Sequence, residues 1–236
     1  MIKKSYCFII LIALICIISC DDGDPPNEII LNVPYHSQLN YNYCAPTCIQ
    51  MWAHYDTGTC YSQNDIASYI GLGATGGIDP WSVRNGVEYY TYSPGYVADF
   101  CYGSPGAQGD LISSCITGIQ EYVPAIMPFY EARHAVLVIG FEWHNEGDRP
   151  IAEVMYYHDP DEYWGANMAV VASELEEYYF TPIYGIYYVI IGYRSFLYDG
   201  IDGHDNFVLR RGIYYGGPSI YDPKGLLDDL NIDPEI

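Results

Sequence analysis

Basic residues are scarce in this chain. Only 9 lysines and arginines stand against 30 aspartates and glutamates, which gives the 236 residues a formal net charge of −21. A surface that binds nucleic acid needs clustered basic side chains to contact phosphates, so the composition excludes nucleic acid as an expected partner. Electrostatic attraction to an anionic membrane is excluded for the same reason, and any attachment to a membrane has to come from lipid.

Other common signatures are missing as well. No repeat period is visible, and the glycine-rich segment 71–77 has no lysine and no preceding strand, so it is not a phosphate-binding loop. Metal-ligand spacing is confined to Cys44 and Cys48, a helical i, i+4 pair with no second pair nearby, so we expect no metal and no cofactor. With 50% hydrophobic and 17% charged residues, the chain is typical of a globular protein.

The N-terminal segment has the pattern of an export signal. Lys3 and Lys4 precede an apolar run that ends at Cys20, and this pattern predicts that residues 1–19 are removed. The letters IISC resemble the bacterial lipoprotein signal, so we expect Cys20 to carry lipid and residues 20–28 to form an acidic tether. The alternatives are an ordinary secretory signal or a single membrane anchor. We expect an exported monomer on the periplasmic or cell-surface side of a bacterial membrane.

Hydrophobic spacing predicts helices early in the chain and strands later. Because helices precede an antiparallel sheet, we expect an α+β fold over residues 29–236, with a Tyr-rich C-terminal extension from about Thr181. Pro46 fits only the first turn of a helix, so the first helix must begin close to Cys44. The predicted helices span 44–55, 62–70, 79–90 and 108–122, and the predicted strands span 29–34, 124–130, 134–143, 151–160 and 184–193.

Cys44 is a candidate nucleophile because of its place at a helix start. Unpaired backbone N–H groups and the positive end of the helix dipole favour the thiolate there, and the thiolate is the attacking species. Gln38 precedes it by six residues on a loop, where its side-chain amide could supply a second donor to a developing oxyanion beside the Cys44 N–H. A buried structural cysteine is the alternative from these residues alone.

His134 and Asp159 are the candidate base and orienting group. His134 opens an apolar run that predicts a buried strand. If Glu146-Gly147 is the centre of a symmetric hairpin, Asp159 lies directly across from His134 on the same face, with Cβ atoms about 5 Å apart. The carboxylate would then fix the imidazole tautomer and stabilise its charged form.

The other cysteines of the exported chain predict disulfides. After removal of the signal and lipidation of Cys20, five cysteines remain, so at least one thiol stays unbridged. We expect Cys48 to pair with Cys60 and Cys101 with Cys115, because the members of each pair are near in sequence and export allows oxidation.

The stretches VPYHSQLNYNYCAPTCIQM, HAVLVIGFE and HDP resemble the papain-like cysteine peptidases, and in particular the branch around cysteine peptidase family thirty-nine, which includes bacteriocin-leader peptidases. The resemblance extends over about residues 32–160. It implies a helical half that carries the cysteine, packed on an antiparallel sheet half that carries His and Asp. It also implies that Gln38 serves the oxyanion hole, Cys44 is the nucleophile, His134 the base and Asp159 the orienting group.

The function expected from this resemblance is a lipid-anchored cysteine peptidase that acts on a peptide or protein through a thioester. Two alternatives stay open from the sequence. One is a catalytically inactive papain-like domain used for binding, against which the complete set of four residues argues. The other is a thiol amidase or transglutaminase-like acyltransferase, which the six-residue spacing from Gln38 to Cys44 disfavours without excluding.

Overall fold

The computed structural model describes residues 27–74, 76–91, 96–103, 108–131, 133–181 and 187–194. The predicted signal peptide, Cys20, most of the tether and the C-terminal part from residue 195 lie outside these residues. In the part of the chain that is described, no helix is both long and apolar enough to cross a membrane.

The described strands form one antiparallel sheet of seven strands in the order β2-β7-β3-β4-β5-β6, with β1 added alongside β4. The predicted strands between residues 124 and 193 are confirmed. The strands β2 and β6 had no prediction, and β1 begins and ends earlier than expected. The strands are β1 Asn27–Ile30, β2 Tyr96–Gly103, β3 Ala125–Phe129, β4 His134–Glu146, β5 Arg149–His158, β6 Met168–Val171 and β7 Tyr187–Arg194.

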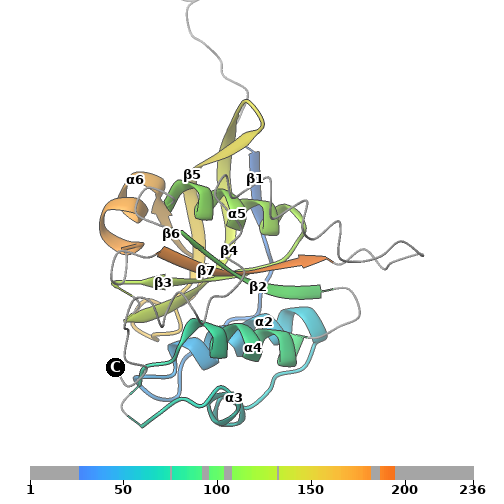
Figure 1. Ribbon diagram of the computed structural model, residues 1–236, viewed down its shortest axis with the longest axis vertical. Helices are drawn as coiled ribbons and strands as arrows, with labels where there is room; N and C mark the ends of the chain where they lie inside the picture. The colour runs from blue at the N-terminus through green and yellow to red at the C-terminus, as the bar shows by residue number, and fades with distance from the viewer. Residues whose placement is uncertain are drawn as a thin grey trace, which may run out of the picture.

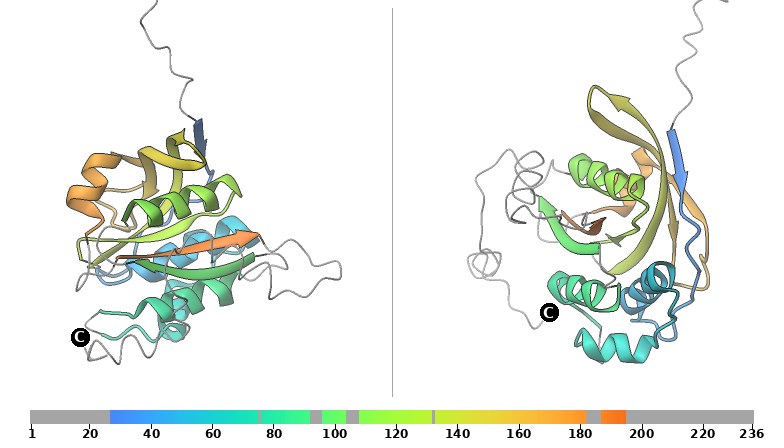
Figure 2. Two further views of the ribbon diagram at one scale, coloured as in Figure 1. Left: turned by 45° about the horizontal axis from the view of Figure 1, so that its top comes forward. Right: turned by 90° about the vertical axis from the view of Figure 1, so that its right-hand side faces the viewer.

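The helices lie on two sides of this sheet (Figure 1). Helices α2, α3 and α4 gather on one side, and Figure 2 shows α5 on the other side of β7. The four predicted helices are confirmed, whereas the turn of α6 that continues into a π-helix had no prediction. The helices are α2 Cys44–Thr57, α3 Gln63–Tyr69, α4 Pro80–Thr91, α5 Gln108–Gln120, α6 Ala172–Glu174 and the π-helix η1 Leu175–Tyr179.

Helix α2 is the element that joins the helical half to the sheet. Its residues 45–53 are all buried, and the Cys48 thiol donates a hydrogen bond to the Ala135 carbonyl at 3.4 Å. This contact places the first turns of α2 against the start of β4. A helix buried on nearly all sides is held by packing rather than by a polar face, so its N-terminal residue is fixed in position.

The β4–β5 hairpin forms, but its predicted register is wrong. Glu146 pairs with Arg149, and the two turn residues are Gly147 and Asp148 rather than Glu146 and Gly147. Gly147 has φ of 64°, so the first turn position takes the left-handed conformation that two-residue hairpin loops require and that glycine adopts without strain. The turn centre thus moves by one residue.

Asp159 is consequently not in the ladder opposite His134. β5 ends at His158, which pairs with Leu137, while His134 pairs with Phe129 on the other neighbouring strand. Moving the turn centre by one residue displaces the pairing by two, and an even displacement keeps each side chain on its original face. The prediction that His134 and Asp159 share a face therefore survives the error in register.

The predicted Cys48–Cys60 disulfide is wrong. Both thiols are unbridged. Cys48 is fully buried in α2, where its thiol donates to the Ala135 carbonyl of β4. Cys60 is exposed in the segment after the helix, where its sulfur lies near Gln50 Nε2 and His36 Nε2. The side chain of Cys101 lies outside the described residues, and so does the predicted Cys101–Cys115 pair.

Candidate active site

Cys44 is the first residue of α2, as predicted. The first four N–H groups of a helix have no partner within it, so the Cys44 N–H is one of the donors presented at this end. Pro46 is the third residue of the helix and lacks an N–H, which costs nothing in the first turn. The cysteine is partly exposed, whereas the residues after it are buried, so its thiol is the accessible one at the helix start.

His134 and Asp159 contact each other directly. His134 Nε2 lies 2.7 Å from Asp159 Oδ1, and both side chains are largely buried, with exposed fractions of 18% and 7%. Because Nε2 is bound to the carboxylate, Nδ1 is the ring nitrogen left to face the thiol of Cys44. The structure thus brings together three of the four predicted site residues.

The pKa of His134 reflects both neighbours. Burial lowers it, but the hydrogen bond that the ring donates to Asp159 and the interaction with Cys44 outweigh burial and raise the pKa from 6.5 to about 10. An imidazole in this setting is protonated at neutral pH. A protonated imidazole between a thiol and a carboxylate is the arrangement in which a thiolate and an imidazolium form an ion pair.

The segment after β5 holds Asp159 in place. Asp159 Oδ1 accepts a second hydrogen bond from the Asp161 N–H at 2.8 Å, and the Asp159 N–H donates to the Gly165 carbonyl at 2.9 Å. With two donors on one oxygen, the carboxylate is oriented before any substrate arrives.

His158 fixes the same segment from its other side, a role that the sequence analysis missed. Its Nε2 lies 2.9 Å from the Val33 carbonyl, and its Nδ1 accepts the Asn167 N–H at 3.1 Å. Burial lowers the pKa of His158, although its backbone hydrogen bonds oppose this, and a neutral ring can donate at one nitrogen while it accepts at the other. The adjacent letters H and D in HDP were the available signal.

Gln38 is near this segment but is not bonded to Cys44. Its N–H donates to the Pro160 carbonyl at 2.8 Å, and its Nε2 donates to the Tyr41 carbonyl at 3.2 Å. Its Oε1 is buried and has no hydrogen-bond partner among the described residues. Among the described residues, one hydrogen of Gln38 Nε2 and the buried Gln38 Oε1 therefore make no hydrogen bond. The backbone of Gln38 is bound to Pro160, the residue after Asp159.

Gln63 holds the backbone on both sides of Gln38, another role that the sequence did not reveal. Its Oε1 accepts the Leu39 N–H at 2.8 Å, and its Nε2 donates to the Ser37 carbonyl at 2.8 Å. The side chain is 3% exposed and also donates to Gln50 Oε1 at 2.9 Å. Ser62, the residue before α3, makes no side-chain capping bond.

Three tyrosines near the site interact with its charges. Burial, followed by the charge of Asp159, raises the pKa of Tyr35 and of Tyr157. Burial, followed by the charges of Cys44 and Asp79, also raises the pKa of Tyr188 on β7. The hydroxyl groups of these tyrosines are therefore close enough to Asp159 or Cys44 to interact with them electrostatically. A low-dielectric wall of this kind strengthens the electrostatic interactions inside it.

Comparison with solved structures finds two peptidase domains. The chain resembles a double glycine motif protease from an AMS/PCAT transporter in complex with the leader peptide, at 16% identity and a TM-score of 0.47, over 72% of this chain and 98% of that one. It resembles the peptidase domain of Streptococcus ComA, a bi-functional ABC transporter involved in a quorum sensing pathway, at 10% identity and a TM-score of 0.46, over 70% and 100%.

A third similar structure is UfSP from C. elegans, at 13% identity and a TM-score of 0.50, over 75% of this chain and 36% of that one. At this identity the likeness concerns the fold alone. A search of curated proteins finds no match.

The family comparison covers the residues of the site themselves. The model of the Peptidase_C39 like family matches residues 30–185, a span that contains Gln38, Cys44, His134 and Asp159. The helical half carrying the cysteine and the antiparallel sheet half carrying the histidine are those of the α+β papain-like fold predicted from the sequence. This chain belongs to the Peptidase_C39 like family.

Proposed function

We propose that this protein is a lipid-anchored cysteine peptidase that hydrolyses peptide bonds through a thioester. The observation that carries the proposal is the 2.7 Å contact between His134 Nε2 and Asp159 Oδ1, on an imidazole that also interacts with Cys44. A nucleophile, a base and an orienting carboxylate in this relation are the constellation needed for acyl transfer.

In the first half of the reaction, the Cys44 thiolate attacks the carbonyl carbon of the scissile peptide. The electron pair of the carbonyl moves to its oxygen, where the Cys44 N–H and the remaining Nε2 hydrogen of Gln38 act as donors. Collapse of this intermediate breaks the C–N bond, and the protonated His134 gives its proton to the leaving amine. The acyl group is then a thioester on Cys44.

In the second half, neutral His134 takes a proton from water as the water attacks the thioester. The C–S bond breaks, the acid product leaves, and His134 is again protonated opposite the thiolate. Asp159 keeps the ring oriented through both halves, because its Oδ1 is bound to Nε2 and Nδ1 alone is left to exchange protons.

A thiol-directed probe tests this proposal. Iodoacetamide or a vinyl sulfone should label Cys44 faster than an ordinary thiol, and Cys44→Ala should abolish both the labelling and peptide turnover without changing the melting temperature. Cys60 is exposed as well, so the experiment uses Cys60→Ser as the background. Equal labelling rates for Cys44 and free cysteine, or turnover that persists in Cys44→Ala, would refute the proposal.

The membrane anchor is a separate part of the proposal, supported by the IISC pattern and the acidic tether. We propose that Cys20 carries the lipid and that the mature monomer faces the periplasm or the cell exterior. Globomycin, or Cys20→Ala, should release the protein from the membrane fraction. A wild-type mature protein that begins at another residue and is recovered free of membrane would contradict this part without affecting the peptidase.

A further inference from the structure

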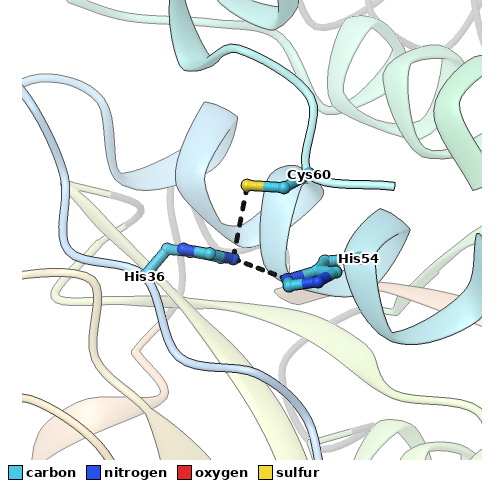
Figure 3. Close-up of side chains that lie close together, drawn as sticks. All are labelled: His36, His54 and Cys60. Carbon is cyan, nitrogen blue, oxygen red and sulfur yellow. Dashed lines mark hydrogen bonds between the residues drawn. The ribbon is translucent and has the colours of Figure 1, made fainter. Parts of the chain in front are cut away.

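Two histidines and a cysteine outside the active site converge on one point (Figure 3). His36 comes from the loop before α2, His54 from the last turn of α2, and Cys60 from the segment after it. His36 Nε2 lies 2.9 Å from His54 Nδ1 and 3.7 Å from Cys60 Sγ. All three ligand atoms lie within 4.8 Å of one another. We propose that His36, His54 and Cys60 form a zinc-binding site.

The spacing of the three atoms is close to that of a tetrahedral zinc site. With Zn–N of about 2.0–2.1 Å and Zn–S of about 2.3 Å, two nitrogens stand about 3.3 Å apart and a nitrogen and a sulfur about 3.6 Å apart. The contact between His36 and His54 has to lengthen by a few tenths of an ångström, and the contact to Cys60 already fits. Rotation of exposed Cys60 supplies the remaining adjustment.

The chain is folded locally to bring these residues together. Gly58 follows α2 in the left-handed conformation, with φ of 72°, and its N–H donates to the His54 carbonyl. This reverses the chain, so that Cys60 returns alongside the last turn of the helix instead of extending away from it. The predicted disulfide partner of Cys60 was Cys48, but the reversal directs Cys60 to His36 and His54.

The electrostatic setting favours a cation. The site lies at the C-terminal end of α2, where unpaired carbonyls and the negative end of the helix dipole attract positive charge, in a chain with a net charge of −21.

Gln50 contacts the sulfur of Cys60 through its side-chain amide. Its Nε2 lies 3.5 Å from Cys60 Sγ and also donates to the Tyr61 carbonyl at 2.6 Å, while its Oε1 accepts from Gln63. A hydrogen bond to a ligating sulfur fixes its orientation, as the outer contacts of metal sites commonly do. Through Gln63, the same chain of amides reaches the loop that carries Gln38.

The donor set selects the class of metal. Two imidazoles and a thiolate suit zinc and do not suit magnesium or calcium, which require oxygen ligands. Three protein ligands leave a fourth position for water on the exposed side, next to Cys60. Ten helical residues, about 15 Å, separate His54 from Cys44, so the metal would fasten the loop before α2 to the end of that helix and take no part in the peptidase chemistry.

The test is a zinc titration of the full chain in the Cys44→Ala background, because an active-site thiol and imidazole could otherwise bind zinc themselves. After chelator treatment, competition with a chromophoric chelator should give one equivalent of Zn²⁺ bound with a Kd below about 1 µM. At a free Zn²⁺ concentration one hundred times Kd, the melting temperature should rise by about 5–10 °C. Co²⁺ should give a thiolate-to-metal charge-transfer absorption.

Cys60→Ser should remove that absorption and weaken Zn²⁺ binding at least about tenfold, as should His36→Gln and His54→Gln. Cys60 is exposed, so its serine variant should melt like the parent in the absence of metal. His144→Gln is the matched control, since His144 is exposed and paired with Glu153 elsewhere, and it should bind Zn²⁺ like the parent. Unchanged affinity in Cys60→Ser, no binding below 1 µM, or binding of Cu(I) but not Zn²⁺ would overturn the assignment.

Discussion

Replacement of Asp159 by asparagine tests the electrostatics of the site. The substitution keeps the size of the side chain and an oxygen that can accept from His134 Nε2 and from the Asp161 N–H, but it removes the negative charge that lies 2.7 Å from the ring. The pKa of His134, about 10 in the native protein, should fall toward neutrality. The alkaline limb of the pH profile of kcat/KM should move to lower pH with it.

The effect on stability depends on pH in a defined direction. Since the folded-state pKa of His134 is raised above its ordinary value of 6.5, its stabilising contribution is complete below pH 6.5 and is lost as the pH rises toward about 10. Charge-assisted hydrogen bonds between largely buried groups are worth about 1–3 kcal/mol. Asp159→Asn should therefore reduce the free energy of unfolding by about that amount at pH 6 and by much less at pH 10.

The measurement is urea unfolding of the wild type and Asp159→Asn at pH 6 and near pH 10, together with an NMR titration of His134. The protein contains a matched control: His144 Nδ1 lies 2.9 Å from Glu153 Oε1, nearly the same distance, but the two side chains are 54% and 44% exposed. Solvent screens such a pair, so Glu153→Gln should change stability by less than about 0.5 kcal/mol at either pH. If the Asp159→Asn loss is equal at pH 6 and pH 10, or if wild-type His134 titrates near 6.5, the reasoning is refuted.

Three further substitutions test the roles assigned around Cys44. His134→Ala should reduce kcat/KM nearly as much as Cys44→Ala, measured with a peptide that the wild type cleaves; a small loss would show that another group is the base. Gln38→Ala should reduce kcat about 10²–10³-fold with little change in KM if its amide serves the oxyanion, and a change in KM alone would point to ground-state binding. Gln63→Leu removes the hydrogen bonds that hold the backbone around Gln38, so it should reduce kcat about tenfold in the same assay. In the double variant it should add little to the loss caused by Gln38→Ala. An additive loss would show that Gln63 acts independently of Gln38.

Much of the fold could be predicted because its signals are local. The periodicity that predicts α2 depends on residues within one helix, and Pro46 limits where that helix starts. The strand β4 carries a long apolar run, Ala135–Phe141. By contrast, β6 has four residues, too few for an alternation to be visible, and it forms because β5 presents an edge for it to pair with.

The register of the β4–β5 hairpin could not be predicted from local sequence patterns. The presence of a turn near Gly147 could be predicted, but its centre depends on which residue takes the positive φ. The ladder also shifts between Val138 and Gly140. At that point β1 pairs with β4, and a Cβ on Gly140 would overlap the Ile29 carbonyl. This contact joins residues more than one hundred positions apart, and no pattern within β4 reveals it.

The same distinction separates the catalytic residues from the rest of the site. Cys44 and His134 each begin a secondary-structure element, and such positions can be found from the sequence because the elements themselves are periodic. Gln63 and His158 act through hydrogen bonds to backbone atoms of distant segments, Ser37, Leu39 and Val33 among them. Any residue type offers the same backbone atoms, so these hydrogen-bond partners cannot be identified from the sequence.

The cluster of His36, His54 and Cys60 could not be predicted for a related reason. Its ligands are 18 and 6 residues apart, and only the chain reversal at Gly58 makes them neighbours. Residues of this kind are brought together by the fold and not by a local sequence pattern, so only the structure reveals them.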